Sequence, residues 1–394
     1  MSLTFGAELR WRHETYDPPR FGLEEGRTFD ANEERFLFDA DLRATWWRVF
    51  VQIDTAAEQG WPQARPFDHS ATDLSQGFIE VAPPDGHMVV RLGRQELDLP
   101  GNRLVGVNDP AGIRRDFDGL NAQVRAGDTV FDLFAVQPVL NQPGAFDDAA
   151  QPGEHFAGVN MHHFWTTAQL PAVDVFVFRR ERDTSFVTTA QGRDRRDTWG
   201  TRLSGQLGGF DYADQLDIQR GSVGATPVRA SGFTLQMSRT WSDVRGAPTW
   251  LLSAARASGD SHPNDTHVGS FDPLYPNLSY STDAGYLFPS NIKDVSMSLA
   301  LTPVYWLRVQ SGLYVAWRVS RADAVYQPPG FVLVAPSAGS SGRIASLPFL
   351  SVDAHATRYL EFSLSAIRLI AGPVISSVHG RSANYLLTQS IFRF

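Results

Sequence analysis

Apolar and polar residues alternate strictly at the start of the chain. Over residues 3–12 every odd position is apolar, and every even position is polar, charged or glycine. A period of two is typical of a β-strand whose two faces meet different surroundings, because successive side chains point to opposite sides. The pattern recurs at 36–46, 48–54 and 307–318, whereas 249–259 alternates poorly. The pattern predicts an all-β protein whose strands each have one apolar face.

Eighteen segments carry strand patterns. We predict strands at 3–14, 34–46, 47–58, 75–82, 87–97, 115–125, 129–139, 156–168, 172–182, 195–207, 210–221, 228–241, 249–259, 291–303, 306–319, 346–357, 359–370 and 382–394. Strands of soluble proteins cluster at about 5 to 6 residues, whereas a tilted transmembrane strand needs about 9 to 11. Most of the predicted strands reach the transmembrane length.

The connections between these segments alternate between long and short. Short connections follow the even-numbered strands and contain turn-forming residues, as at 83–86, 125–128, 170–172 and 208–209. Long connections follow the odd-numbered strands at 15–33, 59–74, 98–114, 140–155, 183–194, 260–290, 320–345 and 371–381, and only 222–227 is brief. Short periplasmic turns, long extracellular loops and an even strand number describe an outer-membrane barrel. We therefore predict a single transmembrane antiparallel β-barrel of about 18 strands, with residues 1–394 as one domain.

The two chain ends and the aromatic residues agree with a place in the bacterial outer membrane. Phe394 ends an alternating strand, which resembles the signal that such barrels present to their assembly machinery. Tryptophans lie near several strand ends, as in the aromatic girdles at membrane interfaces. The first residues contain no basic region followed by an apolar run, so an export signal has been removed or was never present.

Composition and motifs exclude several functions. The chain has no cysteine, so it has no disulfide, thiolate zinc site or cysteine nucleophile. A net charge of −8 argues against a nucleic-acid-binding protein, whose binding surface is basic. Neither a GxSxG nor an HExxH motif occurs, and the adjacent His162 and His163 point to opposite faces of a strand. We therefore predict no enzymatic activity.

The polar parity of a barrel of this size is expected to line water, because about 16 to 18 strands leave an aqueous channel. The arginines on this parity are Arg10, Arg12, Arg35, Arg43, Arg48, Arg91, Arg202, Arg308 and Arg318, and the carboxylates are Glu8, Asp39, Asp41, Asp54, Asp211 and Asp217. Rings of arginine are a known device of anion pores. The carboxylates either cancel that field in salt bridges or weaken the hold on a passing anion so that it can leave.

Several motifs resemble the alginate export porins of bacterial outer membranes. They are ASGD at 257–260, SFDPLYP at 270–276, RLGRQEL at 91–97, RRDFDG at 114–119, WR at 317–318 and DAVY at 323–326. The resemblance implies an eighteen-stranded barrel whose arginine-lined lumen passes an anionic uronate polysaccharide outward by passive diffusion. It also implies that Arg91, Arg94, Arg114 and Arg115 lie at the lumen or its constriction. Arg94 lies on the apolar parity of its predicted strand, which indicates a bulge or a position above the membrane.

The expected partners are the anionic polysaccharide, outer-membrane lipid and lipopolysaccharide, and periplasmic export components, with the protein itself a monomer. Loops 59–74 and 98–114 are long enough to fold into the mouth of the barrel. No cofactor is predicted, although Asp260, Asp265, Asp272 and Asp283 give one outer loop enough oxygen ligands for calcium.

Two alternatives remain at this stage. A substrate-specific channel for uptake of small carboxylate nutrients would use the same charges. A soluble, lectin-like sandwich would instead bury the apolar parity, so that Phe36, Leu42, Val309 and Val315 would lie in a dry core between two sheets.

Overall fold

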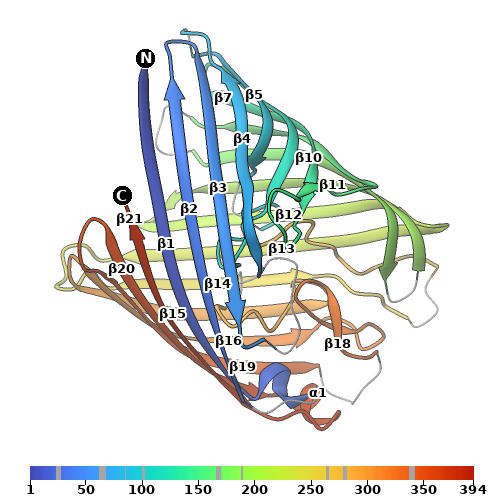
Figure 1. The fold of residues 1–394 in the computed structure, drawn as a ribbon. Coiled ribbons are helices and arrows are strands. Elements are labelled where there is room, and N and C mark those ends of the chain that lie inside the picture. The colour runs from blue at the N-terminus through green and yellow to red at the C-terminus, as the bar shows by residue number, and fades with distance from the viewer. Residues whose placement is uncertain are drawn as a thin grey trace.

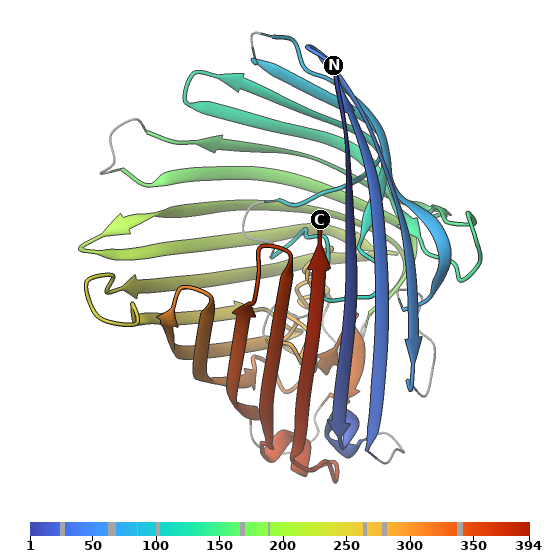
Figure 2. The same ribbon diagram turned by 60° about the vertical axis from the view of Figure 1, so that its left-hand side comes forward.

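The chain folds into a closed β-barrel (Figures 1 and 2). The computed structural model describes residues 1–23, 28–61, 68–84, 86–99, 103–165, 170–187, 190–262, 266–277, 282–336 and 342–394. The eighteen barrel strands are β1 (Ser2–Asp17), β2 (Phe29–Arg43), β3 (Trp47–Gln59), β4 (Ser70–Val81), β5 (Met88–Glu96), β6 (Asp116–Ala126), β7 (Thr129–Leu140), β9 (Glu154–His163), β10 (Ala172–Val187), β11 (Ala190–Leu207), β12 (Phe210–Val223), β13 (Thr226–Thr240), β14 (Thr249–Ala257), β15 (Ile292–Val304), β16 (Leu307–Arg318), β19 (Arg343–His355), β20 (Leu360–Ala371) and β21 (Ala383–Arg393).

Each barrel strand pairs antiparallel with the next one, and β21 pairs with β1. Three short strands and two short helices lie in the connections: η1 (Pro19–Gly22), β8 (Ala149–Ala150), β17 (Val325–Gln327), β18 (Phe331–Val334) and α1 (Pro373–Ser376). Among the described residues, no helix is long and apolar enough to cross a membrane. The predicted fold class is therefore confirmed.

The apolar parity faces outward and the polar parity faces inward. On β2, the Phe36 side of the strand is open, with 41% of Phe36 exposed, whereas Arg35 is only 1% exposed. Leu42, Val309 and Val315 are partly exposed on the same outer face. The sandwich alternative is wrong, because its dry core would have covered these side chains.

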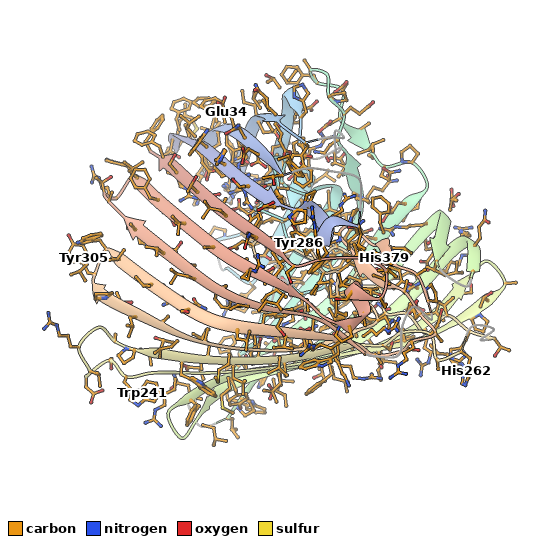
Figure 3. All side chains as sticks on the ribbon, turned by 90° about the horizontal axis from the view of Figure 1, so that it is seen from below. Glu34, Trp241, His262, Tyr286, Tyr305 and His379 are labelled. Atoms are coloured by element: carbon orange, nitrogen blue, oxygen red, sulfur yellow. The ribbon has the colours of Figure 1, made fainter. Side chains whose placement is uncertain are left out.

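The two ends of the barrel differ as predicted (Figure 3). Trp241 and Tyr305 belong to short turns and lie at one end, while His262 and His379 belong to long connections and lie at the other. The chain ends at the short-turn end, where Phe394 and Ala7 of β1 exchange two backbone hydrogen bonds of 3.2 and 3.1 Å. In outer-membrane barrels the short turns are periplasmic.

One predicted long loop, 183–194, is instead a tight hairpin. β10 continues to Val187 and β11 begins at Ala190, so pairing extends through most of the segment. Its polar side chains belong to strands that continue beyond the apolar band. Arg193 and Glu181, for example, form an ion pair of 2.8 Å across the two strands.

The wall between β4 and β5 opens toward the long loops. Pairing between these strands ends at Gly77 and Arg94. From that point toward the long loops, the β7–β9 loop (141–153) takes the place of β5 beside β4, with a parallel bridge between Thr72 and Ala145. A bulge in β4, where the register against β3 shifts, accompanies the opening.

Arg94 fills this opening and does not line the lumen. It follows Leu92 on the outward parity, as its sequence position indicated. Its guanidinium donates to the Asp118 carboxylate at 2.8 and 3.0 Å and to the carbonyls of Leu74 (3.0 Å) and Asp148 (3.2 Å). The implied lumen position is therefore corrected: a bulge and a splayed pair of strands place Arg94 in the wall.

Candidate functional site

Three arginines and two carboxylates alternate along the inner wall near the short turns. The Asp41 carboxylate accepts hydrogen bonds from Arg43 and Arg48, each at 2.8 Å. The Glu80 carboxylate lies 4.0 Å from Arg48 and 2.7 Å from Arg91. The register produces this order, because it sets Arg43 opposite Arg48 and Arg48 opposite Glu80. We call these five residues the rim ladder; three cations against two anions leave one net positive charge.

The rim ladder is open to the interior and rests on aromatic rings. The exposed fraction of the side chain is 58% for Arg43, 29% for Arg91 and 20% for Arg48. The Arg91 guanidinium lies 4.2 Å from the centre of the Phe78 ring, and the Arg48 guanidinium lies 4.8 Å from that of Phe50. Cation–π contacts of this kind hold a guanidinium in position. The ladder therefore presents ordered cations to a solute.

A second charged group on β1 and β2 is buried beneath the β5–β6 loop (97–115). Arg10 donates to the Asp109 carbonyl at 2.5 Å, and Arg35 donates to the same carbonyl at 3.0 Å and to the Asp109 carboxylate at 2.9 Å. Arg10 also forms an ion pair with Glu33, and Arg35 forms one with Glu8 at 2.5 Å. These arginines hold the loop inside the barrel, as its length had indicated.

Asp109 is the electrostatic centre of this docked loop. Its carboxylate also accepts a hydrogen bond of 2.7 Å from Arg114, which lies 3.5 Å from Glu96. Burial alone would raise the pKa of the Asp109 carboxyl, but Arg35, Arg114 and Arg10 outweigh burial and hold that pKa well below its usual range. Asp109 is therefore ionised at every pH at which the protein is expected to work.

Arg12 joins the same group from the neighbouring position on β1. It pairs with Glu14 at 2.6 Å and donates to the Pro110 carbonyl of the loop at 3.2 Å. The Tyr385 hydroxyl donates to Glu14 at 2.5 Å, so β21 is tied in as well. Arg12 is buried, and both terminal nitrogens of its guanidinium donate to protein partners.

Arg115 clamps two inserted loops together. Its guanidinium donates to the Gly106 carbonyl of the β5–β6 loop at 2.8 Å and to the carbonyls of Tyr275 and Pro276 at 2.6 and 3.1 Å. The latter two belong to the β14–β15 loop (258–291). Backbone bonds join the loops directly, from Gly106 to the Tyr275 carbonyl (3.0 Å) and from Tyr275 to the Leu104 carbonyl (2.7 Å). Arg115 therefore acts on loops, not on open lumen.

The β14–β15 loop is anchored to the inner wall of β10–β12. Arg180 donates to the Asp272 carboxylate at 3.0 Å, and Gln219 and the Asp272 backbone exchange hydrogen bonds of 2.6 and 3.0 Å. Arg196 donates to the Ser270 carbonyl at 3.5 Å. Burial would raise the pKa of Asp272, but Arg180 and Arg196 hold it far below its usual range. The SFDPLYP motif is thus the anchor of an inserted loop.

The motifs that carry the family resemblance meet in this loop assembly. The Asp323 carboxylate accepts hydrogen bonds from the Asp260 backbone (3.0 Å), the Ser270 hydroxyl (2.5 Å) and the Tyr326 hydroxyl (2.6 Å). These partners belong to the ASGD, SFDPLYP and DAVY motifs. Segments far apart in the sequence are therefore joined by one buried carboxylate.

The structure places the remaining predicted residues separately. Arg202 lies 3.2 Å from the buried Asp174, which also bonds His162 at 2.7 Å. Arg308 is on the inner parity of β16, and among the described residues no carboxylate lies within 4 Å of it. Arg318 is buried at the loop end of the same strand. They form no common cluster with the rim ladder.

Asp39 also lies on the inner parity, directly opposite Gly6 in the register of β1 and β2. It is partly exposed. A side-chain carbon added at Gly6 would approach the Asp39 carboxylate to 2.8 Å, so the glycine leaves room for this acid.

Across the ring from the rim ladder, the inner wall is rich in hydroxyl and amide groups. A cavity of about 480 Å³ lies against it. Its polar lining includes Ser238, Ser253, Ser296, Ser298, Ser351, Ser365, Gln236 and Gln310, and its charged lining residues are Asp211, Asp283 and Asp294. We call this surface the serine wall. It offers hydrogen-bond partners without a strong positive field.

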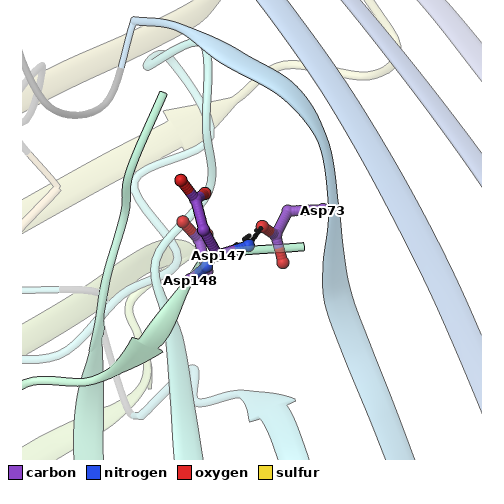
Figure 4. Close-up of side chains that lie close together, drawn as sticks. All are labelled: Asp73, Asp147 and Asp148. Atoms are coloured by element: carbon purple, nitrogen blue, oxygen red, sulfur yellow. Dashed lines mark hydrogen bonds between the residues drawn. The ribbon is translucent and has the colours of Figure 1, made fainter. Parts of the chain in front are cut away.

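One group of carboxylates has the geometry to hold a cation (Figure 4). Oxygens of Asp73, Asp147 and Asp148 lie within 4.8 Å of one another where the β7–β9 loop meets β4. Asp73 already accepts backbone hydrogen bonds from Asp147 (2.8 Å) and Asp148 (3.1 Å). Burial raises the pKa of Asp148 to about 6, and the Asp73 charge adds to the shift. These hydrogen bonds are enough to explain the cluster as a loop junction.

The calcium prediction for the β14–β15 loop stays a prediction. Asp260 accepts a backbone hydrogen bond from Gly269, and Asp272 is engaged by Arg180. Asp283 lines the cavity, and Asp265 lies outside the described residues.

Sequence reasoning missed the arginines that anchor the loops, above all Arg180 and Arg196. Arg196 lies on the polar parity of its predicted strand, so parity could have selected it, whereas Arg180 shares its parity with Phe176 and Phe178. Their partners lie about 75 to 90 positions further along the chain, in a loop whose path the pattern does not give. The serine wall was missed because isolated serines carry no strong functional signal.

A closed sheet with an apolar outer face and a charged, partly hollow interior defines an outer-membrane β-barrel of the channel class. The comparisons with known proteins refine this class. The chain matches the family described as Alginate export over residues 1–389, and it belongs to that family. The family and the fold indicate the outer membrane as its location.

Solved structures of porins share the fold at low sequence identity. A BenF-like porin from Pseudomonas fluorescens Pf-5 has a TM-score of 0.66 and 10% identity, covering 100% of this chain and 99% of its own. Pseudomonas aeruginosa OccK11 (OpdR) has a TM-score of 0.62 and 10% identity, with coverage of 100% and 96%. OccK2 (OpdF) of the same organism, solved in complex with glucuronate, has a TM-score of 0.60 and 10% identity, and the match covers 100% of this chain and 96% of its own. No curated protein matches the chain in sequence.

Replacing Asp109 tests the docking of the β5–β6 loop. We expect Asp109→Asn to weaken docking by on the order of 1 to 3 kcal/mol, because Arg35 and Arg114 lose a charged hydrogen-bond acceptor. Single-channel conductance should rise and become noisier, and amides of the loop should exchange faster. Asp243→Asn, in an exposed short turn, is the matched control. Unchanged conductance and exchange in Asp109→Asn would contradict the assignment.

Proposed function

We propose that the protein is a non-enzymatic channel through which an anionic polysaccharide of uronate units diffuses passively, outward from the periplasm. Membership in the alginate export family supports this cargo and direction. The observation that carries the proposal is the rim ladder, because its guanidinium groups are ordered and reachable from the interior.

The chemistry of a uronate chain matches the rim ladder. Each sugar carries one carboxylate, which the planar fork of a guanidinium can bind with two hydrogen bonds. Asp41 and Glu80 already accept some of the hydrogen bonds that these guanidinium groups can donate. A bound carboxylate therefore competes with a fixed one, so each step is weak, and a channel needs weak, repeated binding. Arg308 offers a further cation on the inner parity of β16.

The serine wall supports the second half of the path. A uronate chain also carries hydroxyl groups, and the hydroxyl and amide groups of this wall can exchange hydrogen bonds with them without holding the carboxylates. The inserted β5–β6 and β14–β15 loops fill much of the loop end beside β1, β2 and β10–β12. The cavity along the serine wall therefore supports a route beside the loops.

Uptake of small carboxylates is the second candidate. The two inserted loops favour it, because they narrow the loop end, where a nutrient would enter. OccK2, one of the structures that share this fold, was solved with glucuronate, a single uronate unit. Both candidates use the carboxylate chemistry of the rim ladder and differ in the size of the cargo.

Ion selectivity tests the role of the inward arginines. In planar bilayers we expect the wild type to prefer anions and the variant Arg43→Gln/Arg91→Gln/Arg308→Gln to lose most of that preference while the pore stays open. Removing three fixed lumen cations removes the local excess of anions. The control Arg179→Gln/Arg195→Gln/Arg368→Gln removes three exposed outward arginines and should leave selectivity unchanged. Cation preference in the wild type would overturn the proposal.

Block by uronates of different length separates the two candidates. If a polymer path exists, oligouronates should reduce the current at concentrations at least tenfold lower than monomeric glucuronate, because several weak sites bind one chain at once. The Arg43→Gln/Arg91→Gln/Arg308→Gln variant should lose this difference. Equal block by monomers and oligomers would favour small-carboxylate uptake.

A further inference from the structure

The outer face of the barrel changes abruptly from apolar to basic toward the long loops on β12–β15. On β15, for example, the lipid-facing Val295 is followed outward by Lys293, the only lysine of the chain. The exposed basic residues at this level are Arg220 on β12, Arg229 on β13, Arg256 on β14 and Lys293 on β15. We call these four residues the basic belt.

The register sets like charges directly against each other in the basic belt. Arg220 is opposite Arg229, and Arg256 is opposite Lys293. Side chains at directly opposed positions start about 4.5 to 5.5 Å apart at Cβ, so like charges there are destabilising unless something screens them. Within the described part of the chain, no carboxylate lies within 4 Å of any of the four cations.

Neighbouring charges on the same outer face do have partners. On β10 and β11, Arg179 forms an ion pair of 2.7 Å with Asp197. On β1 and β2, the exposed outward residues at the loop end include the acidic Asp17, Asp30 and Glu34. Among the described residues, the four cations of the basic belt therefore lack the fixed counter-charge that Arg179 has on the neighbouring strands.

The basic belt lies just beyond the apolar band of the outer face. Immediately toward the short turns lies the apolar band that faces hydrocarbon, with Ile218 and Val295 each about two-fifths exposed. The belt thus lies at the headgroup region on the extracellular side. In the outer leaflet of a bacterial outer membrane this region holds lipopolysaccharide, whose lipid A carries phosphates. Cations at a membrane surface attract anionic headgroups strongly.

We propose that the basic belt is a binding site for the lipid A phosphates of a lipopolysaccharide molecule. A phosphate between Arg256 and Lys293 accepts charge-assisted hydrogen bonds from both and removes their mutual repulsion. Arg220 and Arg229 form an equivalent pair for a second phosphate. The acyl chains then lie along the apolar band below. This site is separate from the lumen, so it does not depend on the identity of the cargo.

Lipid binding to the purified full-length protein tests the site. We compare binding of bisphosphorylated lipid A in detergent, by native mass spectrometry, between the wild type and Arg256→Gln/Lys293→Gln. The variant should bind about thirtyfold more weakly, because each surface cation contributes roughly fivefold to binding of anionic lipid. Lys293→Arg should bind like the wild type. Arg245→Gln/Arg358→Gln, which removes two exposed arginines from short turns, should also be unchanged.

Channel conductance and strand content measured by circular dichroism verify that each variant is folded. Three results would each overturn the proposal. One is equal lipid A binding by the wild type and Arg256→Gln/Lys293→Gln. Another is equal binding of dephosphorylated lipid A by the wild type, which would show that only the apolar band binds. The last is a change of oligomeric state in the variant without loss of lipid A binding, which would assign the belt to a second copy of the chain.

Discussion

The need of every backbone N–H and C=O for a partner within hydrocarbon constrains this molecule more than any other interaction. A sheet meets that need without water only if it closes, and here β21 pairs with β1 from Glu8 to Asp17. Closure also determines the surroundings of the two faces of the sheet. The outward side chains contact lipid, and the polar inward side chains need water, ions or inserted loops as hydrogen-bond partners.

The polar side chains of the inner wall find partners in two ways. Near the long loops, buried arginines such as Arg10, Arg35 and Arg180 bind carboxylates and the carbonyls of loops that enter the barrel. Leaving one of these cations unpaired would be costly, so the loops and the arginines stabilise each other. Near the short turns, Arg43, Arg48 and Arg91 on β2, β3 and β5 stay accessible. The same residue type therefore has a structural role at one end and remains free to meet solute at the other.

Much of this fold could be predicted because lipid imposes a strict two-residue period. That period located the strands, their apolar face and the alternation of loop lengths. It failed at 183–194, where strands leave the membrane and lose their apolar parity. At Arg94 the period gave the outward side correctly, and it was the lumen position implied by the family resemblance that was wrong, because a bulge in β4 opens the wall there. The pairing of Arg43, Asp41, Arg48 and Arg91 follows from register, which parity does not supply.

The paths of the loops were the least predictable feature of the structure. The SFDPLYP motif was recognised, but its contact with Arg180 joins positions about 90 residues apart, and no local pattern encodes such a distance. The family resemblance implied that Arg115 lies at the lumen or its constriction, whereas its guanidinium holds two loops together. The serine wall is formed by hydroxyl and amide groups from six strands, and these groups make a common surface only when the barrel brings the strands together.

The central claim is that the polar parity surrounds water, and cysteine accessibility along β15 tests it most directly. The chain has no native cysteine, so single substitutions report cleanly. In intact outer membranes, cysteines at Ser296 and Ser298 should react with a charged, water-soluble thiol reagent, and those at Val295, Met297 and Leu299 should not. Reaction of the second set in preference to the first, or no alternation between them, would contradict the account.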